Sequence, residues 1–297
     1  SCQKGTDDRR GSCPFCMERN MNHMKNLFIF MTSLVLLLAG CSGKEYVIVQ
    51  VADAQLGFSA ADRCQREGIE FDNDVSYERD CLLRAVDFIN ALNPDAVVFT
   101  GDQVNYPNIP AQWEAFAETI SRIDDDIKVF HIPGNHDVII KDSGVDSSPF
   151  TNCYGDDRFV HSERGVKMVG INTNLIQYDD SMEYDQIDWL EAVLEKPCKD
   201  DVTILFGHHP FFMTDIDEPD SYFPIKGSRR REYFELFSVM DVDAVYAGHR
   251  HETFEAEYDG IPMKTTTSVA YQIGNSRPSV RVITIKDGAV SDELHEI

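Results

Sequence analysis

Short apolar runs alternate with amphipathic stretches along the chain from Glu45 onward. The apolar runs are rich in β-branched residues and bounded by polar ones, which is typical of buried strands. Between them, apolar residues recur every three or four positions, which is the spacing of a helix with one buried face. This alternation predicts an α/β fold. The predicted strands are Tyr46–Ala52, Ala96–Thr100, Lys128–Ile132, Val166–Ile171, Val202–Phe206 and Ala244–Ala247.

Helical spacing of apolar residues is found at positions 82–92, 113–123, 187–194 and 233–240. Ser76 is the expected N-cap of the first helix, and Pro197 ends the third. Beyond His251 the pattern becomes all-β, and Lys286-Asp287-Gly288 between two alternating runs predicts a hairpin. Because no repeat or Pro/Gly-rich linker interrupts the pattern, a single domain over residues 46–297 is the simplest organisation.

The N-terminal region carries an apolar run, Leu27–Leu38, that is too short to span a bilayer comfortably but has the length of a signal-peptide core. It ends in Leu38-Ala39-Gly40-Cys41, which resembles a bacterial lipobox. We therefore expect residues 24–40 to be a lipoprotein signal peptide and 41–45 a tether that follows a lipidated Cys41. Residues 1–23 are interpreted as an over-extended reading frame. The expected location is the bacterial cell envelope, on its periplasmic or outer-surface face.

The chain is strongly acidic, with a formal net charge of −24. This charge argues against a nucleic-acid partner and against direct binding to anionic lipid. The only membrane contact expected is the lipid at Cys41. The remaining cysteines of the mature chain fit no metal motif: Cys81 is expected in the core, Cys64 and Cys153 in loops where they could pair, and Cys198 is left open.

Polar residues that can bind metal follow five of the predicted strands. Because ligands of open α/β sheets bind beyond the carboxyl ends of strands, we expect these residues to meet at one rim. Carboxylate, carboxamide and imidazole suit Mn, Fe, Zn or Co, and Mg stays open. The set holds no thiolate, which disfavours a structural zinc site. The strand-end residues are Asp53 and Gln55, Asp102, Asn135-His136-Asp137, His208-His209, and His249 with His251.

The order D-x-Q, G-D, G-N-H-D, H-x-P, G-H-x-H resembles that of the calcineurin-like metallophosphoesterases, over Tyr46 to about Ile285. The stretches 53–58, 154–157 and 216–223 are most similar to the calcineurin-like phosphoesterase domain-containing subgroup, also called complete S transactivated protein. The resemblance implies a four-layer sandwich of two mixed β-sheets flanked by helices. It also implies a hydrolase in which two metal ions, held about 3.5–4 Å apart, clamp a phosphoester for attack by a bridging hydroxide.

The resemblance also implies a role for each motif residue. Asp53 and His251 would bind the first metal and Asp102 would bridge the pair, while Asn135, His208 and His249 would bind the second. His208 is preferred over His209 because the family spacing is His-x-Pro. His136 would be a general acid or a cation facing the phosphate, and Asp137 would be structural.

Two positions depart from the broader family. Gln55 stands where many members have His, and we expect it at the first metal. Asn105 stands where many have an Asp that tunes the catalytic His, so we expect either a less basic His136 or a different orienting partner for it. The segments 138–151 and 211–227 are expected to be loops that decide the substrate. Arg229-Arg230-Arg231 is interpreted as a solvated charge run rather than a phosphate clamp.

The predicted activity is that of a phosphomonoesterase. Its substrate would be a phosphorylated small molecule or a phosphoprotein carrying phospho-Ser or phospho-Thr. Two alternatives remain: a phosphodiesterase acting on nucleotides or lipids, and a lipoprotein that binds phosphate without turnover.

Overall fold

The computed structural model describes residues 45–195 and 201–297, and Glu45–Ile297 forms one compact unit. The expectations for the N-terminal 44 residues and for Cys198 lie outside the described residues. No helix in the described part of the chain is both long and apolar enough to cross a membrane.

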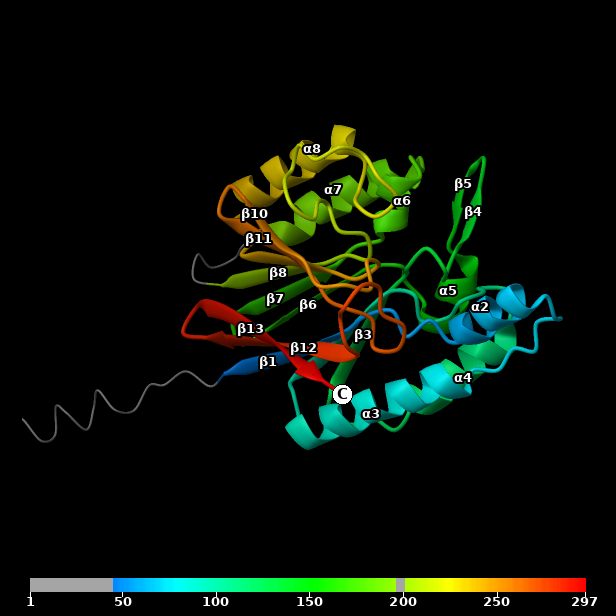
Figure 1. Ribbon diagram of the computed structural model, residues 1–297. Helices are drawn as coiled ribbons and strands as arrows, with labels where there is room; N and C mark the ends of the chain where they lie inside the picture. Colours follow the sequence, from blue (N-terminus) through cyan, green and yellow to red (C-terminus); the bar gives the residue numbers. More distant parts are fainter. Residues whose placement is uncertain (1–44, 196–200) are drawn as a thin grey trace, which may run out of the picture. The chain divides into compact units, whose positions relative to one another are not determined.

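Two mixed sheets form the centre of this unit (Figure 1). In the five-stranded sheet, β1, β2 and β3 are parallel, and β12 and β13 add antiparallel neighbours beside β1. Its order is β13 (Ala289–Glu296), β12 (Ser279–Lys286), β1 (Tyr46–Val51), β2 (Ala96–Thr100) and β3 (Lys128–Ile132). The register sets Ile48 beside Ala96 in the parallel pair and beside Ile283 in the antiparallel one.

The six-stranded sheet has a parallel centre with one antiparallel strand at each edge. Its order is β10 (Glu255–Tyr258), β11 (Ile261–Thr265), β9 (Ala244–Ala247), β8 (Val202–Phe206), β7 (Val166–Gly170) and β6 (Phe159–Glu163). The six predicted strands are thus confirmed, with small differences only at their ends.

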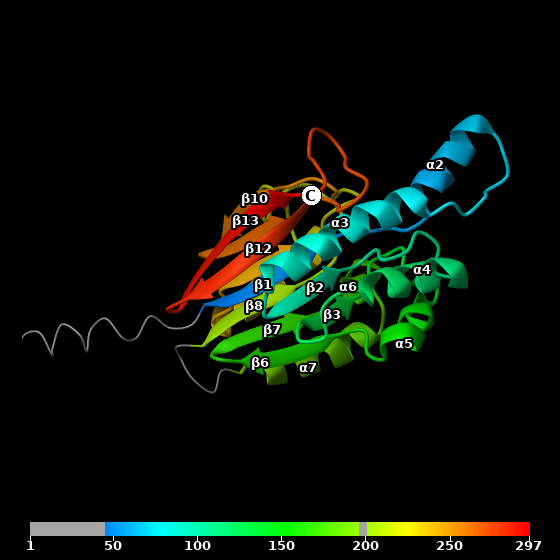
Figure 2. The same cartoon turned by 90° about the horizontal axis from the view of Figure 1, so that it is seen from below.

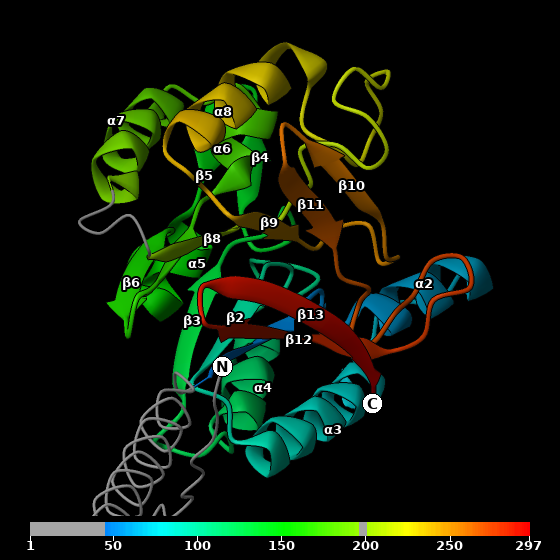
Figure 3. The ribbon, with the colours of Figure 1, turned by 90° about the vertical axis from the view of Figure 1, so that its left-hand side faces the viewer.

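Helices cover the outer face of each sheet, so the predicted four-layer sandwich is confirmed (Figure 3). One pair, α3 (Ser76–Leu92) and α4 (Pro110–Ile120), packs on the five-stranded sheet. The other pair, α7 (Met182–Leu194) and α8 (Gly227–Val239), packs on the six-stranded sheet. Ser76 is the first helical residue rather than the N-cap, because the Asp74 side chain already accepts a hydrogen bond from its N–H at 3.0 Å.

Successive side chains along each strand point to opposite faces of the sheet, and this divides the core into layers. Ile48 and Val98 point into the cluster between the two sheets, where they meet Ile204. Their neighbours Val49 and Val97 point the other way, against α3. Each side of a strand is therefore buried, which explains why these strands read as continuous apolar runs.

Several short elements gather where β1, β2 and β3 end (Figure 2). They are α2 (Phe58–Glu67), α5 (Ser148–Tyr154), α6 (Thr173–Gln177) and the hairpin of β4 (Ile139–Lys141) with β5 (Gly144–Asp146). The segment 138–151, expected to be a loop, therefore contains a hairpin and the start of a helix. The segment before α8, by contrast, has no regular element between 211 and 226, as predicted.

The cysteine predictions are confirmed only for Cys81, which lies in α3 and is buried in the core. Cys64 lies in α2 and is buried, whereas Cys153 lies in α5 and is exposed. Both are free thiols in the described structure, so placing them in loops where they could pair was wrong.

The arginine run at the start of α8 is not a solvated charge run throughout. Arg230 is fully buried, and its guanidinium donates to the backbone oxygens of Ile225 at 2.6 Å and Glu218 at 2.5 Å. It therefore fixes the irregular segment 211–226 to α8. Arg229 bonds Glu183 and Glu232, while Arg231 pairs with Asp217, so both are engaged with carboxylates.

Candidate metal centre

The strand ends bring the predicted residues together from both sheets. Asp53 and Gln55 follow β1, Asp102 follows β2, Asn135 and His136 follow β3, His208 follows β8, and His249 and His251 follow β9. The sheets are linked at this rim, because the backbone N–H of His249 donates to both carboxylate oxygens of Asp53, at 3.1 and 3.0 Å. His208 Nδ1 likewise lies 2.9 Å from the carbonyl oxygen of Thr100.

Two overlapping groups of side chains can hold metal ions. The ligand atoms of Asp53, Asp102 and His208 lie within 4.8 Å of one another, and so do those of His208, His209 and His249. Two further predicted ligands border these groups. His208 Nε2 lies 3.1 Å from Asn135 Oδ1, and His251 Nε2 lies 3.4 Å from Asp53 Oδ1.

Three buried side-chain atoms at this rim have no hydrogen-bond partner in the described structure: Gln55 Oε1, His209 Nε2 and His249 Nε2. An unpaired polar atom in a protein interior costs about 1–3 kcal/mol. Carboxamide oxygens and imidazole nitrogens are also ordinary metal donors. The residues present therefore fit a metal centre.

Tight backbone turns set the direction of these donor side chains. Five of the predicted ligands have left-handed backbones: Asp53 (φ 55°), Gln55 (φ 46°), Asp102 (φ 51°), His249 (φ 66°) and His251 (φ 54°). Such conformations are uncommon for residues other than glycine and cluster at functional sites. Gly134 permits the close approach of β3, because a Cβ there would lie 2.1 Å from Asp102 Oδ1.

The carboxylates and imidazoles of the rim change one another's pKa values. Burial alone would raise the pKa of Asp102, but the charges of His208 and His136 outweigh it and lower that pKa below its usual range. Burial of His208 opposes its charge, yet Asp102 raises its pKa to about 9. Asp102 Oδ2 lies 3.4 Å from His208 Nε2, so each of the two side chains favours the charged form of the other, and a bound cation would compete for the same carboxylate.

His136 has an orienting partner in place of the missing aspartate. Its Nδ1 lies 2.9 Å from the backbone carbonyl oxygen of Asn105. A carbonyl can only accept, so Nδ1 carries a hydrogen and Nε2 is left to meet substrate. The Asn105 side chain instead approaches Gln55, whose Nε2 lies 3.5 Å from its Oδ1.

Asp137 has a structural position. It is fully buried, and its carboxylate accepts hydrogen bonds from the N–H groups of Gln103 at 2.9 Å, Val104 at 3.1 Å and Gly134 at 2.8 Å. These bonds tie the loop after β3 to the loop after β2. They hold Asp102 and His136 in register with each other.

A pocket of about 170 Å³ opens over the rim. Its polar lining comes from Gln55, Asp102, His136, His249 and His251, all identified from the sequence. Its apolar lining, Phe58, Tyr222, Phe223, Tyr271 and Ile273, was not singled out residue by residue. Only the position of Tyr222 and Phe223 in the predicted substrate loop signalled a role. Phe58 ends the stretch 53–58 that resembles the subgroup, whereas Tyr271 lies in a segment without a motif.

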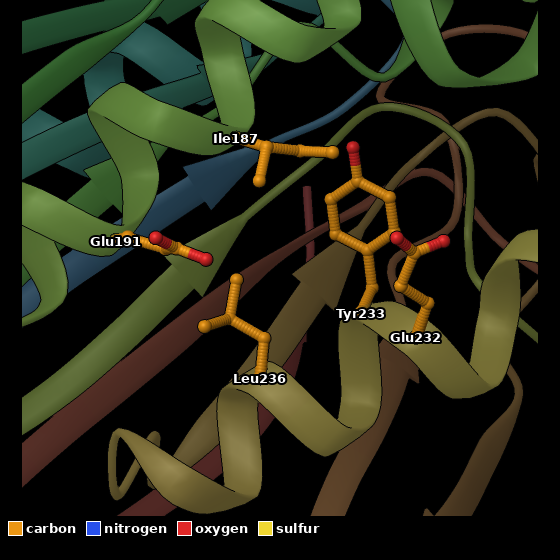
Figure 4. A pocket seen from close by; sticks show the side chains of 5 residues that line it. All are labelled: Ile187, Glu191, Glu232, Tyr233 and Leu236. Atoms are coloured by element: carbon orange, nitrogen blue, oxygen red, sulfur yellow. The ribbon is translucent and has the colours of Figure 1, made fainter.

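A second pocket lies between α7 and α8 and contains none of the predicted site residues (Figure 4). It has a volume of about 110 Å³ and is lined by Ile187, Glu191, Glu232, Tyr233 and Leu236. The polar groups of two of these are already engaged. The Tyr233 hydroxyl donates to Glu183 at 2.9 Å, and Glu232 accepts from Arg229 at 2.5 Å.

Known proteins share both the sequence pattern and the fold. The family model for calcineurin-like phosphoesterases matches residues 47–253. Serine/threonine-protein phosphatase CPPED1 of Mus musculus is 29% identical over 81% of this chain and 80% of its own length. A probable cyclic nucleotide phosphodiesterase of Rhodococcus erythropolis is 28% identical over 60% of this chain and 58% of its own.

Among solved structures, a purple acid phosphatase from yellow lupin superimposes with a TM-score of 0.62 at 12% identity. The superposition covers 85% of this chain and 52% of the lupin chain. At that identity the likeness concerns the fold. The family-model match covers the strand ends and their donors from Asp53 to His251, and by that match this chain belongs to the calcineurin-like phosphoesterase family.

Proposed function

We propose that this phosphoesterase is a metal-dependent phosphomonoesterase that works at the rim of the two sheets. The observation that carries the proposal is the convergence of carboxylate, carboxamide and imidazole donors there. Buried Gln55 Oε1 and His249 Nε2, which lack hydrogen-bond partners in the described residues, support it further.

The rim offers donors for two ions. Asp53, Gln55 and His251 would hold the first, Asn135, His208 and His249 the second, and Asp102 would contribute to both. His209 Nε2 lies in the same cluster and is a further donor for the second ion. When bound, such a pair supplies Lewis-acid stabilisation of phosphoryl oxygens and lowers the pKa of a water molecule.

The chain's own contribution to the reaction centres on His136, which lines the pocket. The Asn105 carbonyl fixes the hydrogen on Nδ1 and thus the direction of the ring. With Nε2 protonated, His136 would donate that proton to the leaving-group oxygen and become neutral. Asp137 would keep this histidine in place by joining the loops after β2 and β3.

Two classes of phosphoester remain to be distinguished. The mouse relative is named a serine/threonine-protein phosphatase, which supports a monoester and, more finely, phospho-Ser or phospho-Thr in a protein. The Rhodococcus relative is named a probable cyclic nucleotide phosphodiesterase and supports the alternative.

The test is turnover of p-nitrophenyl phosphate and bis-p-nitrophenyl phosphate by protein loaded with Mn, Fe or Zn. We expect the monoester to be hydrolysed with the higher kcat/KM. A higher value for the diester would establish the phosphodiesterase alternative. Stoichiometric phosphate binding without turnover of either would establish the non-catalytic one.

We also propose that the mature chain begins at a lipidated Cys41 and is exported to the cell envelope. The proposal is supported by the apolar run and the Leu38-Ala39-Gly40-Cys41 sequence alone. Mass spectrometry of the native protein tests it: an acylated N-terminal cysteine is expected, and an unmodified Cys41 inside a longer chain would contradict it.

A further inference from the structure

One wall of the metal-site pocket is aromatic. Tyr222 and Phe223 belong to the irregular segment before α8, and their ring centroids lie 5.3 and 5.6 Å from that of His249. Phe58 and Tyr271 come from the start of α2 and from the segment between β11 and β12. Their rings lie 6.4 and 6.3 Å from that of His251. An aromatic pair therefore stands beside each of these two histidines.

Both pairs are held in place. Phe58 and Tyr271 contact each other with ring centroids 4.4 Å apart. The Arg250 guanidinium lies 4.3 Å from the centre of the Phe223 ring, within the range of a cation–π interaction. The same guanidinium is paired with Glu252 at 2.9 Å. Arg230 fixes the backbone on either side of Tyr222 through its bonds to Glu218 and Ile225.

Tyr222 keeps a free surface in spite of this support. It is 65% exposed, although it lines the pocket. A fixed, exposed aromatic ring beside a reaction centre is a surface on which a second planar ring can pack.

The pocket lining is poor in side chains that could bind a negatively charged leaving group. None of the described residues that line it is Lys or Arg. The only side chain of the lining that can carry a positive charge is histidine, and three histidines occupy the metal rim. The nearest guanidinium, that of Arg250, lies against Phe223 and is paired with Glu252, so an acidic leaving group would meet no unpaired lysine or arginine among the described residues of the lining. The chain's net charge of −24 would also disfavour such a substrate.

We propose that the aromatic wall selects phosphomonoesters whose leaving group carries a planar aromatic ring. The phosphate would lie at the metal rim beside His136, and the ring would pack against Tyr222 and Phe223 or against Phe58 and Tyr271. This proposal rests on the proposed monoesterase function, because it names the leaving group of the same reaction, and it favours an aromatic leaving group over the aliphatic one of phospho-Ser or phospho-Thr.

Benzyl phosphate and cyclohexylmethyl phosphate test this proposal directly. Both release a primary alcohol of similar size and basicity, so a rate difference reports the ring rather than the leaving-group chemistry. We expect kcat/KM for the benzyl ester to be higher by about 3- to 10-fold, the range expected of one aromatic contact. Either Tyr222→Leu or Tyr271→Leu, according to the pair against which the ring packs, should reduce this ratio, mainly through KM. Tyr222 is exposed, so its replacement should not disturb folding.

Tyr184→Leu is the matched control, because Tyr184 lies on α7, is 71% exposed and does not line the pocket. Its ratio should equal that of the unaltered protein. Equal kcat/KM values for the two esters would overturn the proposal while leaving the phosphatase intact. A ratio unchanged in both pocket variants would overturn it as well. Failure to hydrolyse p-nitrophenyl phosphate with every metal would instead overturn the proposed function, and this proposal with it.

Discussion

At the scale of single residues, the missing hydrogen bond of Gln55 is the observation that points to its role. Its amide oxygen is buried and has no hydrogen-bond partner in the described residues, although its backbone adopts a left-handed conformation with φ 46°. The left-handed backbone and the unpaired buried oxygen each cost free energy, and in a simple turn residue no ligand would offset that cost. We therefore propose that Gln55 binds the first metal, where a neutral amide would be a weaker donor than imidazole.

Replacing Gln55 should change metal affinity in two directions. Gln55→His should bind the first metal more tightly, and Gln55→Ala should bind it about 10–100-fold more weakly. Metal titration of the apo-protein, followed by calorimetry, measures both. If all three proteins bound metal with the same affinity, Gln55 would be a turn residue only.

His136 should separate catalysis from metal binding. His136→Ala is expected to retain its metals but to lose about 10²–10⁴-fold in rate, the usual contribution of a general acid. The loss should be greater for an alkyl phosphate than for p-nitrophenyl phosphate, because a good leaving group needs no proton. Equal losses for the two substrates would exclude the acid role and leave charge stabilisation.

The sequence could identify the rim residues because each directly follows a strongly apolar strand. It could not identify the partner of His136, because that partner is the backbone oxygen of Asn105. The aromatic wall was equally hidden. Phe58 and Tyr271 are neighbours only after folding. Phe58 ends the stretch 53–58 that resembles the subgroup, but Tyr271 belongs to no periodic pattern or motif.

At the scale of elements, long and regular segments could be predicted and short ones could not. The helix α2 was missed because only Ala60 and Cys64 are buried in it, too few for a helical period to be visible. The strands β4 and β5 have only three residues each, and their hydrogen bonds to each other define them. The β12–β13 hairpin was predicted, and Asp287 and Gly288 at its turn have the positive φ values, 50° and 79°, that a two-residue turn requires.

The C-terminal strand also joins the two sheets through Asp292. Its carboxylate accepts a hydrogen bond from the Tyr246 hydroxyl of β9 at 3.0 Å and from Lys264 of β11 at 2.8 Å. It also pairs with Arg281 of β12, whose side chain is 1% exposed. Burial would raise the pKa of Asp292, but the bond from Lys264 and the charge of Arg281 outweigh it and lower that pKa.

Asp292→Asn should therefore lower the free energy of unfolding by about 2–4 kcal/mol at pH 7, because buried Arg281 keeps only the half-exposed Glu255, at 3.6 Å, as a counter-ion. The pKa of Asp292 is lower in the folded state, so its stabilisation is complete above the unfolded value of about 3.9. It is lost as the pH falls below that value. Urea denaturation at pH 7 and pH 3 should show the difference between the two proteins shrinking at the lower pH.

Glu296→Gln is the control for this prediction. Glu296 lies on the same strand, but its ion pair with Arg277 is exposed, with side chains 58% and 73% accessible. Its loss should change stability by less than about 1 kcal/mol. An Asp292→Asn protein no less stable than this control would show that the sheets are held together without the polar link.

On the scale of the whole molecule, neither sheet alone supplies the full set of candidate metal ligands. Asp53, Asp102 and Asn135 come from strands of one sheet, and His208, His249 and His251 from strands of the other. The strand order that brings them together has no signature in a single sequence. The division of the strands between two sheets was anticipated only through the resemblance of the motifs to a family whose fold is known, and the strand order itself was not predicted.

The most direct test of this account is the metal content of the purified protein and of Asp102→Ala, measured by elemental analysis together with p-nitrophenyl phosphate turnover. Glu191→Ala, in the pocket between α7 and α8, is the control. We predict about two metal ions per chain in the unaltered protein and in the control. We predict loss of the metal pair and of activity in Asp102→Ala. An Asp102→Ala protein that kept both ions and its full rate would contradict the account.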